Sequence, residues 1–175
     1  AQVVVAREEQ EGEAPARHFG TGATRTIYCL RARDPDDTAD AKAAEQVGCR
    51  GLMVLPAYVH KGELREAIAH VGAVLQATKL PCMLYNNPPA YGTDFTPPAI
   101  AELAQRHGNL VAVKESSGDA RRVTAIKALL GERLDVLVGM DDMVVEGVAA
   151  GAVGWVAGLV NAFPRASVRL FELAS

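Results

Sequence analysis

Short apolar runs alternate with helical patterns along most of this chain. Two of the runs, Leu80–Tyr85 and Leu110–Val113, read as brief strands that are buried on both faces of a parallel sheet. Between them, residues 97–106 carry apolar side chains at a spacing of three and four, which predicts a helix. A strand, a helix and a second strand form a βαβ unit, whose two strands are parallel and end at the same edge of the sheet. The pattern therefore predicts an α/β fold.

Each of these runs ends at a side chain that can do chemistry, Tyr85 in the first and Lys114 just after the second. A charged ammonium is costly at the end of a buried strand, and a neutral amine there would attack a carbonyl carbon to form a Schiff base. A phenol that faces the same pocket can give and take protons. Two structural alternatives remain open. Lys114 could reach solvent or pair with Glu115 or Asp119, and Tyr85 could simply cover the core.

Helical patterns recur between the apolar runs, with no linker after about residue 20. Besides the one at 97–106, they cover residues 36–47, 63–78, 120–130, 143–150 and 164–174. Asp141 and Asp142 precede the fourth of these and are good N-cap candidates, and Gly131 follows the third where a C-cap is expected.

Six short motifs follow one another in a recognisable order. They are Gly20–Thr26, Gly51–Tyr58, Leu84–Pro88, Val113–Asp119, Val138–Asp142 and Gly151–Asn161. In this order and spacing they resemble the ends of strands three to eight in the dihydrodipicolinate synthase and N-acetylneuraminate lyase family, the class I aldolases that handle pyruvate on a (β/α)8 barrel. The resemblance implies a TIM-type α/β barrel, of which about six of the eight β/α units are recognisable here.

The resemblance also implies roles for five residues. Lys114 corresponds to the Schiff-base lysine, so no cofactor is expected beyond the covalent imine, and Tyr85 corresponds to the tyrosine that relays protons above it. Tyr58 corresponds to a tyrosine that in many members reaches across a subunit interface. Gly139 and Val156 correspond to positions that line the keto-acid pocket. On the alternative interpretation, Gly139 only marks a turn and Val156 only fills the barrel.

The implied function is that of a lyase that acts on pyruvate or a related 2-keto acid, by aldol addition or cleavage or by dehydration or deamination. One departure bears on the second substrate. Dihydrodipicolinate synthases usually place an arginine two residues after the Tyr-Asn-x-Pro element, where it binds the carboxylate of the aldehyde substrate. This chain has Ala90 there, and alanine cannot replace a bidentate arginine. The sequence therefore argues against aspartate semialdehyde and favours branches that act on pyrroline carboxylates or keto sugar acids.

Residues 1–19 are predicted to form an atypical polar segment, and residues 20–175 a partial barrel domain. A complete barrel needs about 250 residues, and the Gly-x-x-Gly-Glu motif by which the family holds the keto-acid carboxylate is not found in this chain. The alternative function is therefore a catalytically silent barrel fragment with a structural or oligomerisation role. Open sheet edges favour association, so a homo-oligomer is expected.

Composition excludes several classes of function. A net charge of −3 offers no basic surface for nucleic acid, and no apolar stretch is long enough to span a membrane. The N-terminus does not read as a signal peptide, and the three cysteines share no metal-type spacing, as expected of reduced thiols in a cytoplasmic protein. The four histidines are scattered, so no metal site is expected. The predicted partners are a small keto acid and further copies of the chain.

Overall fold

The computed structural model describes residues 2–5, 18–19, 23–24, 27–30, 37–57 and 62–175, with side chains from residue 37 onward. The described strands form one nine-stranded sheet in the order β3-β2-β1-β9-β8-β7-β6-β5-β4. Their bounds are β1 Gln2–Val5, β2 His18–Phe19, β3 Ala23–Thr24, β4 Ile27–Leu30, β5 Gly51–Val54, β6 Cys82–Asn86, β7 Leu110–Glu115, β8 Asp135–Val138 and β9 Gly154–Ala157.

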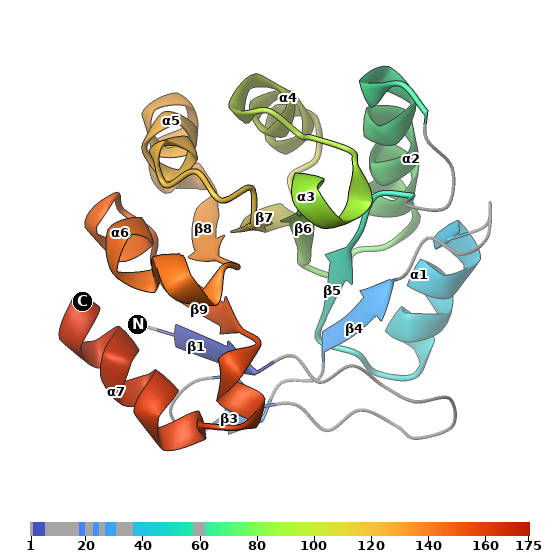
Figure 1. Ribbon diagram of the computed structural model, residues 1–175. Helices are drawn as coiled ribbons and strands as arrows, with labels where there is room; N and C mark the ends of the chain where they lie inside the picture. Colours follow the sequence, from blue (N-terminus) through green and yellow to red (C-terminus); the bar gives the residue numbers. More distant parts are fainter. Residues whose placement is uncertain (1, 6–17, 20–22, 25–26, 31–36, 58–61) are drawn as a thin grey trace.

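The strands curve around a common centre and the helices lie outside them (Figure 1). Strands β5 to β9 are parallel neighbours that form a half-barrel, and β4 and β1 continue the parallel order at its two ends. The described helices are α1 Asp37–Gln46, α2 Leu64–Ala77, α3 Pro88–Tyr91, α4 Pro97–Arg106, α5 Arg121–Leu130, α6 Val144–Ala149 and α7 Pro164–Ala174. The predicted α/β arrangement of the TIM type is confirmed.

Two apolar layers explain why the strands are apolar throughout. Residues that point outward, such as Leu52, Leu84 and Val113, belong to the large core between the sheet and the helices. Residues one position along, such as Met53 and Met83, belong to a smaller cluster inside the curve. Because side chains alternate across a strand, each strand must be apolar on both faces to fill both layers.

The predicted helices lie within one or two residues of the observed ones, but one predicted cap is wrong. Gly131 does cap the end of α5, with φ of 54°. The N-cap position of α6 is Met143, which makes no side-chain capping bond. Asp141 instead accepts backbone N–H bonds from Gly158 at 3.0 Å and Leu159 at 2.8 Å. Its carboxylate therefore joins the segment after β8 to the segment after β9, a contact that local sequence does not reveal.

The N-terminal strands add pairings that the sequence did not predict. Strand β5 pairs in parallel with β6 on one side and with β4 on the other. Strand β4 begins after the stretch 20–26, which was predicted to be the end of the third barrel strand. Within that stretch the structure describes only β3, which is antiparallel to β2. In the segment 1–19, which was predicted to be polar and atypical, β1 pairs in parallel with β9 and β2 pairs with β1.

Two of the three cysteines, Cys49 and Cys82, have described side chains, and both are buried in the core, as the sequence predicted. Burial raises the pKa of the Cys82 thiol to about 12, so this side chain stays protonated and acts as a core residue. Across the described ranges, no helix has the length and apolar character that a membrane span requires.

Candidate active site

Tyr85 and Lys114 lie directly opposite each other at the ends of two neighbouring strands. The register of β6 and β7 pairs Tyr85 with Lys114 and then Asn86 with Glu115. Lys114 Nζ is 3.9 Å from the centroid of the Tyr85 ring, and the lysine is only 9% exposed. The structure therefore places the amine and the phenol at one site inside the curve of the sheet, as the sequence predicted.

The two acids that could have paired with Lys114 are bonded elsewhere. The Glu115 carboxylate accepts bonds from Asn86 Nδ2 at 3.0 Å and from the Ser117 N–H at 2.7 Å. Asp119 accepts two side-chain bonds from Arg121. Within the part of the chain that the structure describes, no carboxylate forms an ion pair with Lys114. The amine is buried beside an aromatic ring, and the two acids that follow it in the sequence, Glu115 and Asp119, are bonded to other donors.

Gly139 follows β8 and lies against the lysine. A Cβ built on Gly139 would overlap the Ser116 hydroxyl and would come within 2.9 Å of Lys114 Cε. A residue without a side chain is therefore required here by the close approach of the neighbouring strand end, in addition to any role in a turn.

Ser116 is a site residue that the sequence reasoning missed. It is 1% exposed, and its hydroxyl has no hydrogen-bond partner among the described residues. A buried polar group without a partner is uncommon and calls for a physical explanation. The signal was present in the sequence, since Ser116 comes two positions after Lys114 and strand side chains alternate with a period of two.

The inner cluster forms the apolar floor of the site. Val156 on β9 is 1% exposed and belongs to this cluster, together with Met53, Met83 and Leu137. Tyr85 packs against the same cluster. Val156 thus contributes to the barrel filling, and its contact with a keto acid stays a prediction. Tyr58 lies outside the described residues.

The segment after β6 carries two groups that contact Tyr85. Asn87 Nδ2 donates a hydrogen bond to the Tyr85 hydroxyl at 2.9 Å. The Tyr91 ring meets the Tyr85 ring edge to face, with a centroid distance of 5.6 Å and an interplanar angle of 89°. The phenol is therefore held by an amide on its oxygen and by an aromatic ring at its side.

The same segment is anchored at its far end. Asn86, which is fully buried, accepts a bond from the Phe95 N–H at 3.0 Å and donates one to the Phe95 carbonyl at 3.2 Å. Arg122 on α5 binds the Asp94 carboxylate through both terminal nitrogens. This guanidinium holds the pKa of Asp94 below its usual value. These bonds fix residues 87–95 relative to the strand ends.

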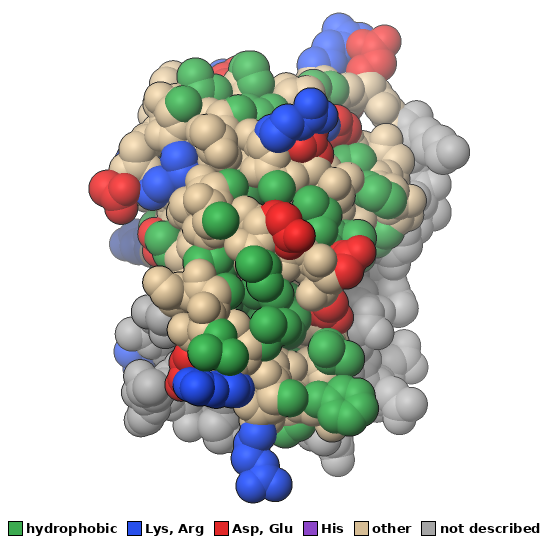
Figure 2. All heavy atoms as spheres, turned by 60° about the vertical axis from the view of Figure 1, so that its left-hand side comes forward, with side chains coloured by type: hydrophobic (Ala, Val, Ile, Leu, Met, Phe, Trp, Pro, Cys, Tyr) green, Lys and Arg blue, Asp and Glu red, His purple; other side chains and the backbone are tan. Residues whose placement is uncertain are grey.

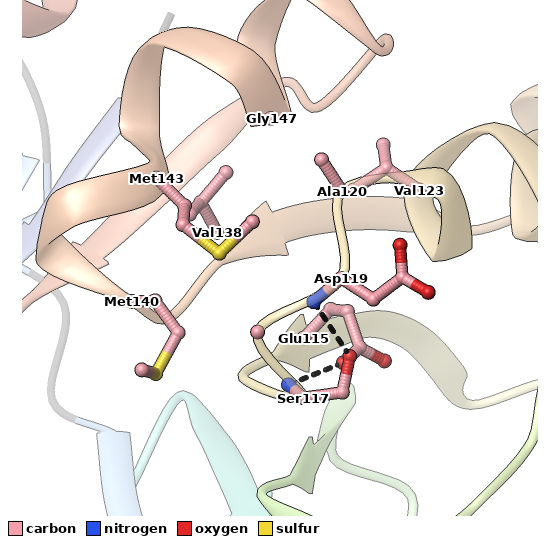
Figure 3. Close-up of a pocket in the computed structure, with 10 residues that line it drawn as sticks. Glu115, Ser117, Asp119, Ala120, Val123, Val138, Met140, Met143 and Gly147 are labelled. Atoms are coloured by element: carbon pink, nitrogen blue, oxygen red, sulfur yellow. Dashed lines mark hydrogen bonds between the residues drawn. The ribbon is translucent and has the colours of Figure 1, made fainter.

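A small pocket lies on the helix side of the same strand ends (Figure 3). Glu115, Ser117 and Asp119 line one side of it, and Met140 and Met143 line the other. Its free volume of about 20 Å³ is close to that of one water molecule. It is too small for a keto acid, and Lys114 is not among its lining residues.

Comparison with known proteins gives relatives of one kind. A family model described as the dihydrodipicolinate synthetase family matches residues 36–175. The 4-hydroxy-tetrahydrodipicolinate synthase of Clostridium tetani is 30% identical over 154 residues, which cover 88% of this chain and 50% of that protein. The protein of the same name from Methanospirillum hungatei is 32% identical over 173 residues, which cover 98% of this chain and 56% of that protein. The chain spans about half the length of these curated relatives.

Solved structures agree with the sequence comparison. The dihydrodipicolinate synthase of Aquifex aeolicus has a TM-score of 0.81 at 28% identity, over 86% of this chain and 52% of that one. The chloride-inhibited dihydrodipicolinate synthase of Acinetobacter baumannii, complexed with pyruvate, has a TM-score of 0.79 at 26% identity, over 86% of this chain and 52% of that one. The matching family model runs from just before α1 to beyond the end of α7, and the chain belongs to the dihydrodipicolinate synthetase family.

Proposed function

We propose that this protein is a class I aldolase-type lyase that acts on pyruvate or a related 2-keto acid through a Schiff base on Lys114. The observation that carries the proposal is the buried Lys114 amine, which lies 3.9 Å from the centroid of the Tyr85 ring while the neighbouring acids are bonded to other groups. Membership of the family supports the reaction class. The pyruvate complex of the Acinetobacter baumannii relative supports the substrate class.

The chemistry uses groups that already face one another. The Lys114 amine adds to the C2 carbonyl of the keto acid, and the resulting hydroxyl leaves as water with a proton donated by the Tyr85 phenol. The phenolate takes up a C3 proton as the iminium becomes an enamine, which then adds to an aldehyde, and the reverse sequence cleaves the same bond. The unpartnered Ser116 hydroxyl donates a hydrogen bond to the bound keto acid. Gly139, which has no side chain, leaves room for the Lys114 side chain itself.

The substrate is proposed to carry no second carboxylate at the position where dihydrodipicolinate synthases bind that of the aldehyde. Ala90 offers only a methyl group there. Arg122, which is near in sequence to the lysine strand, is already bound to Asp94 through two bonds. A keto sugar acid or a pyrroline carboxylate therefore suits the site better than aspartate semialdehyde.

Trapping the imine tests the proposal. Pyruvate and borohydride should add a reduced adduct to a single lysine, and mass spectrometry of the digested protein should find it on Lys114. The Lys114→Ala variant should carry no adduct. Lys127→Ala is the matched control, because Lys127 lies on α5 and binds Glu132 away from the site, so its adduct should equal that of the unaltered protein. An adduct that persists in Lys114→Ala would refute the assignment.

A second candidate function, a catalytically silent fragment with an oligomerisation role, is favoured by the exposed surface. Figure 2 shows apolar side chains on the face that carries α6 and α7. The exposed apolar residues of this part of the chain, which are 41 to 68% accessible, include Val145, Leu159, Phe163, Val168 and Leu173. Apolar surface of this kind is typical of contact with another chain.

Light scattering distinguishes this second function when it is combined with the trapping experiment. A homo-oligomer that forms no adduct would favour the silent fragment over the lyase. A stable monomer at micromolar concentration would contradict the oligomerisation role.

A further inference from the structure

We propose that Asn87 is a positioning residue for Tyr85, which it holds so that the phenol directs its own proton toward the oxygen that leaves the keto acid at Lys114. The inference rests on the proposed lyase function and assigns a role to a residue outside the lysine and tyrosine pair. It starts from one contact, the 2.9 Å hydrogen bond from Asn87 Nδ2 to the Tyr85 oxygen.

The orientation of the Asn87 amide follows from its second bond. Asn87 is the N-cap of α3, and its Oδ1 accepts the Ala90 N–H at 3.3 Å. Because a backbone N–H can only donate, the amide oxygen must face Ala90 and the NH₂ group must face Tyr85. The phenol oxygen is therefore an acceptor in this bond, and its own O–H remains available to donate elsewhere.

The amide is held in place by the backbone around it. Pro88 and Pro89 open α3 with their φ angles fixed by the pyrrolidine rings, and the Tyr91 N–H donates to the Asn87 carbonyl at 3.0 Å. The Tyr91 ring then packs edge to face on Tyr85. Asn87 is thus presented from a rigid turn, which limits how far the phenol can swing.

The position of the phenol matters because the amine lies against its ring. Lys114 Nζ is 3.9 Å from the Tyr85 centroid, so the oxygen of a keto acid bonded to this amine would lie close to the phenol. Proton transfer in a catalytic step requires a heavy-atom approach of about 3 Å. Without the Asn87 bond, the phenol would share its O–H among other orientations and would be aligned with the leaving oxygen for less of the time.

Two substitutions separate positioning from helix capping. Serine and aspartate are both good N-caps, so Asn87→Ser and Asn87→Asp should each preserve the start of α3. Neither can donate to Tyr85 as asparagine does, because the serine side chain is too short and aspartate offers only acceptors. We expect the rate of reduced adduct formation with pyruvate and cyanoborohydride to fall about ten-fold in both, which corresponds to the loss of one hydrogen bond. The pyruvate concentration at half-maximal rate should change less than about two-fold.

A double-mutant cycle with Tyr85→Phe tests whether Asn87 acts through the phenol. In the Tyr85→Phe background, Asn87→Ser should slow adduct formation by no more than about two-fold, since no phenol oxygen remains to be positioned. A full ten-fold effect in that background would overturn the inference, as would wild-type rates in both single variants. If the unaltered protein forms no adduct on Lys114, the proposed function fails and this inference fails with it. An adduct that is insensitive to Asn87 refutes the inference alone.

Discussion

The two faces of the β6 and β7 strand ends differ in how fully their polar groups are bonded. On the helix side, the Asn86 amide makes three hydrogen bonds and both oxygens of Glu115 accept one. On the inner side, the Lys114 amine lies over an aromatic ring and the Ser116 hydroxyl has no partner among the described residues. The helix side fixes the strand ends in register, which allows the inner side to keep groups that remain free for a ligand.

The largest expected effect is the loss of reactivity, without a loss of stability, when Lys114 on the inner face is replaced. Lys114→Met should abolish adduct formation with pyruvate, yet it should leave the free energy of unfolding in urea unchanged or slightly higher. The reason is that methionine fills a similar volume and removes the cost of burying a polar amino group. A loss of more than about 2 kcal/mol would show that the lysine has a structural role and would weaken the contrast between the two faces.

The next largest effect is on the helix side. Asn86→Leu should lower the free energy of unfolding by about 3 kcal/mol, because the Phe95 N–H and one Glu115 oxygen would be buried without partners. Ser116→Ala is the matched inner-face control and should change stability by less than about 0.5 kcal/mol, since its hydroxyl has no bond to lose. Equal losses in the two variants would contradict the comparison.

Replacing Gly139, which is closely surrounded by other side chains, should have an intermediate effect on stability. Gly139→Ala should cost about 1–3 kcal/mol, because the new methyl group overlaps Ser116 and approaches Lys114. The Ser116→Ala/Gly139→Ala pair should recover part of this loss, since the hydroxyl that clashes with the methyl group is then absent. Thermal or urea denaturation of the single and double variants measures the recovery. A purely additive result would mean that the two residues do not meet.

The smallest expected effect is the contribution of the Arg122–Asp94 ion pair to stability, which depends on pH. The pKa of Asp94 is lowered by Arg122, so this pair stabilises the fold above the unfolded value of 3.8, and the contribution is lost as pH falls through the lower folded value. Because the Asp94 side chain is 37% exposed, the contribution should be under about 1 kcal/mol. Unfolding curves of Asp94→Asn should therefore differ from those of the unaltered protein at pH 7 and converge with them once the pH falls below the lowered pKa of Asp94.

Local patterns in the sequence were enough to predict the βαβ order, the helix ranges and the placement of Tyr85 and Lys114 at adjacent strand ends. Each of these predictions depends on hydrophobic periodicity or on the rule that parallel strands end at one edge of the sheet. Both signals can be recognised within about 30 residues of chain. Gly139 and Val156 were placed by the resemblance, and the structure puts both next to the lysine or the inner cluster.

Tertiary structure alone decided which polar groups form hydrogen bonds with each other. Asp141 reads as a helix N-cap, yet it binds N–H groups 17 and 18 positions away, because β8 and β9 are parallel neighbours whose ends lie side by side. The bond from Asn87 to Tyr85 and the unpartnered hydroxyl of Ser116 likewise depend on side-chain directions and on how closely the strand ends approach. The sequence determined where strands and helices form, because their periodicity is local. The hydrogen-bond partners of the polar side chains were settled only by the three-dimensional packing, because a hydrogen bond needs distances and angles that no spacing along the chain specifies.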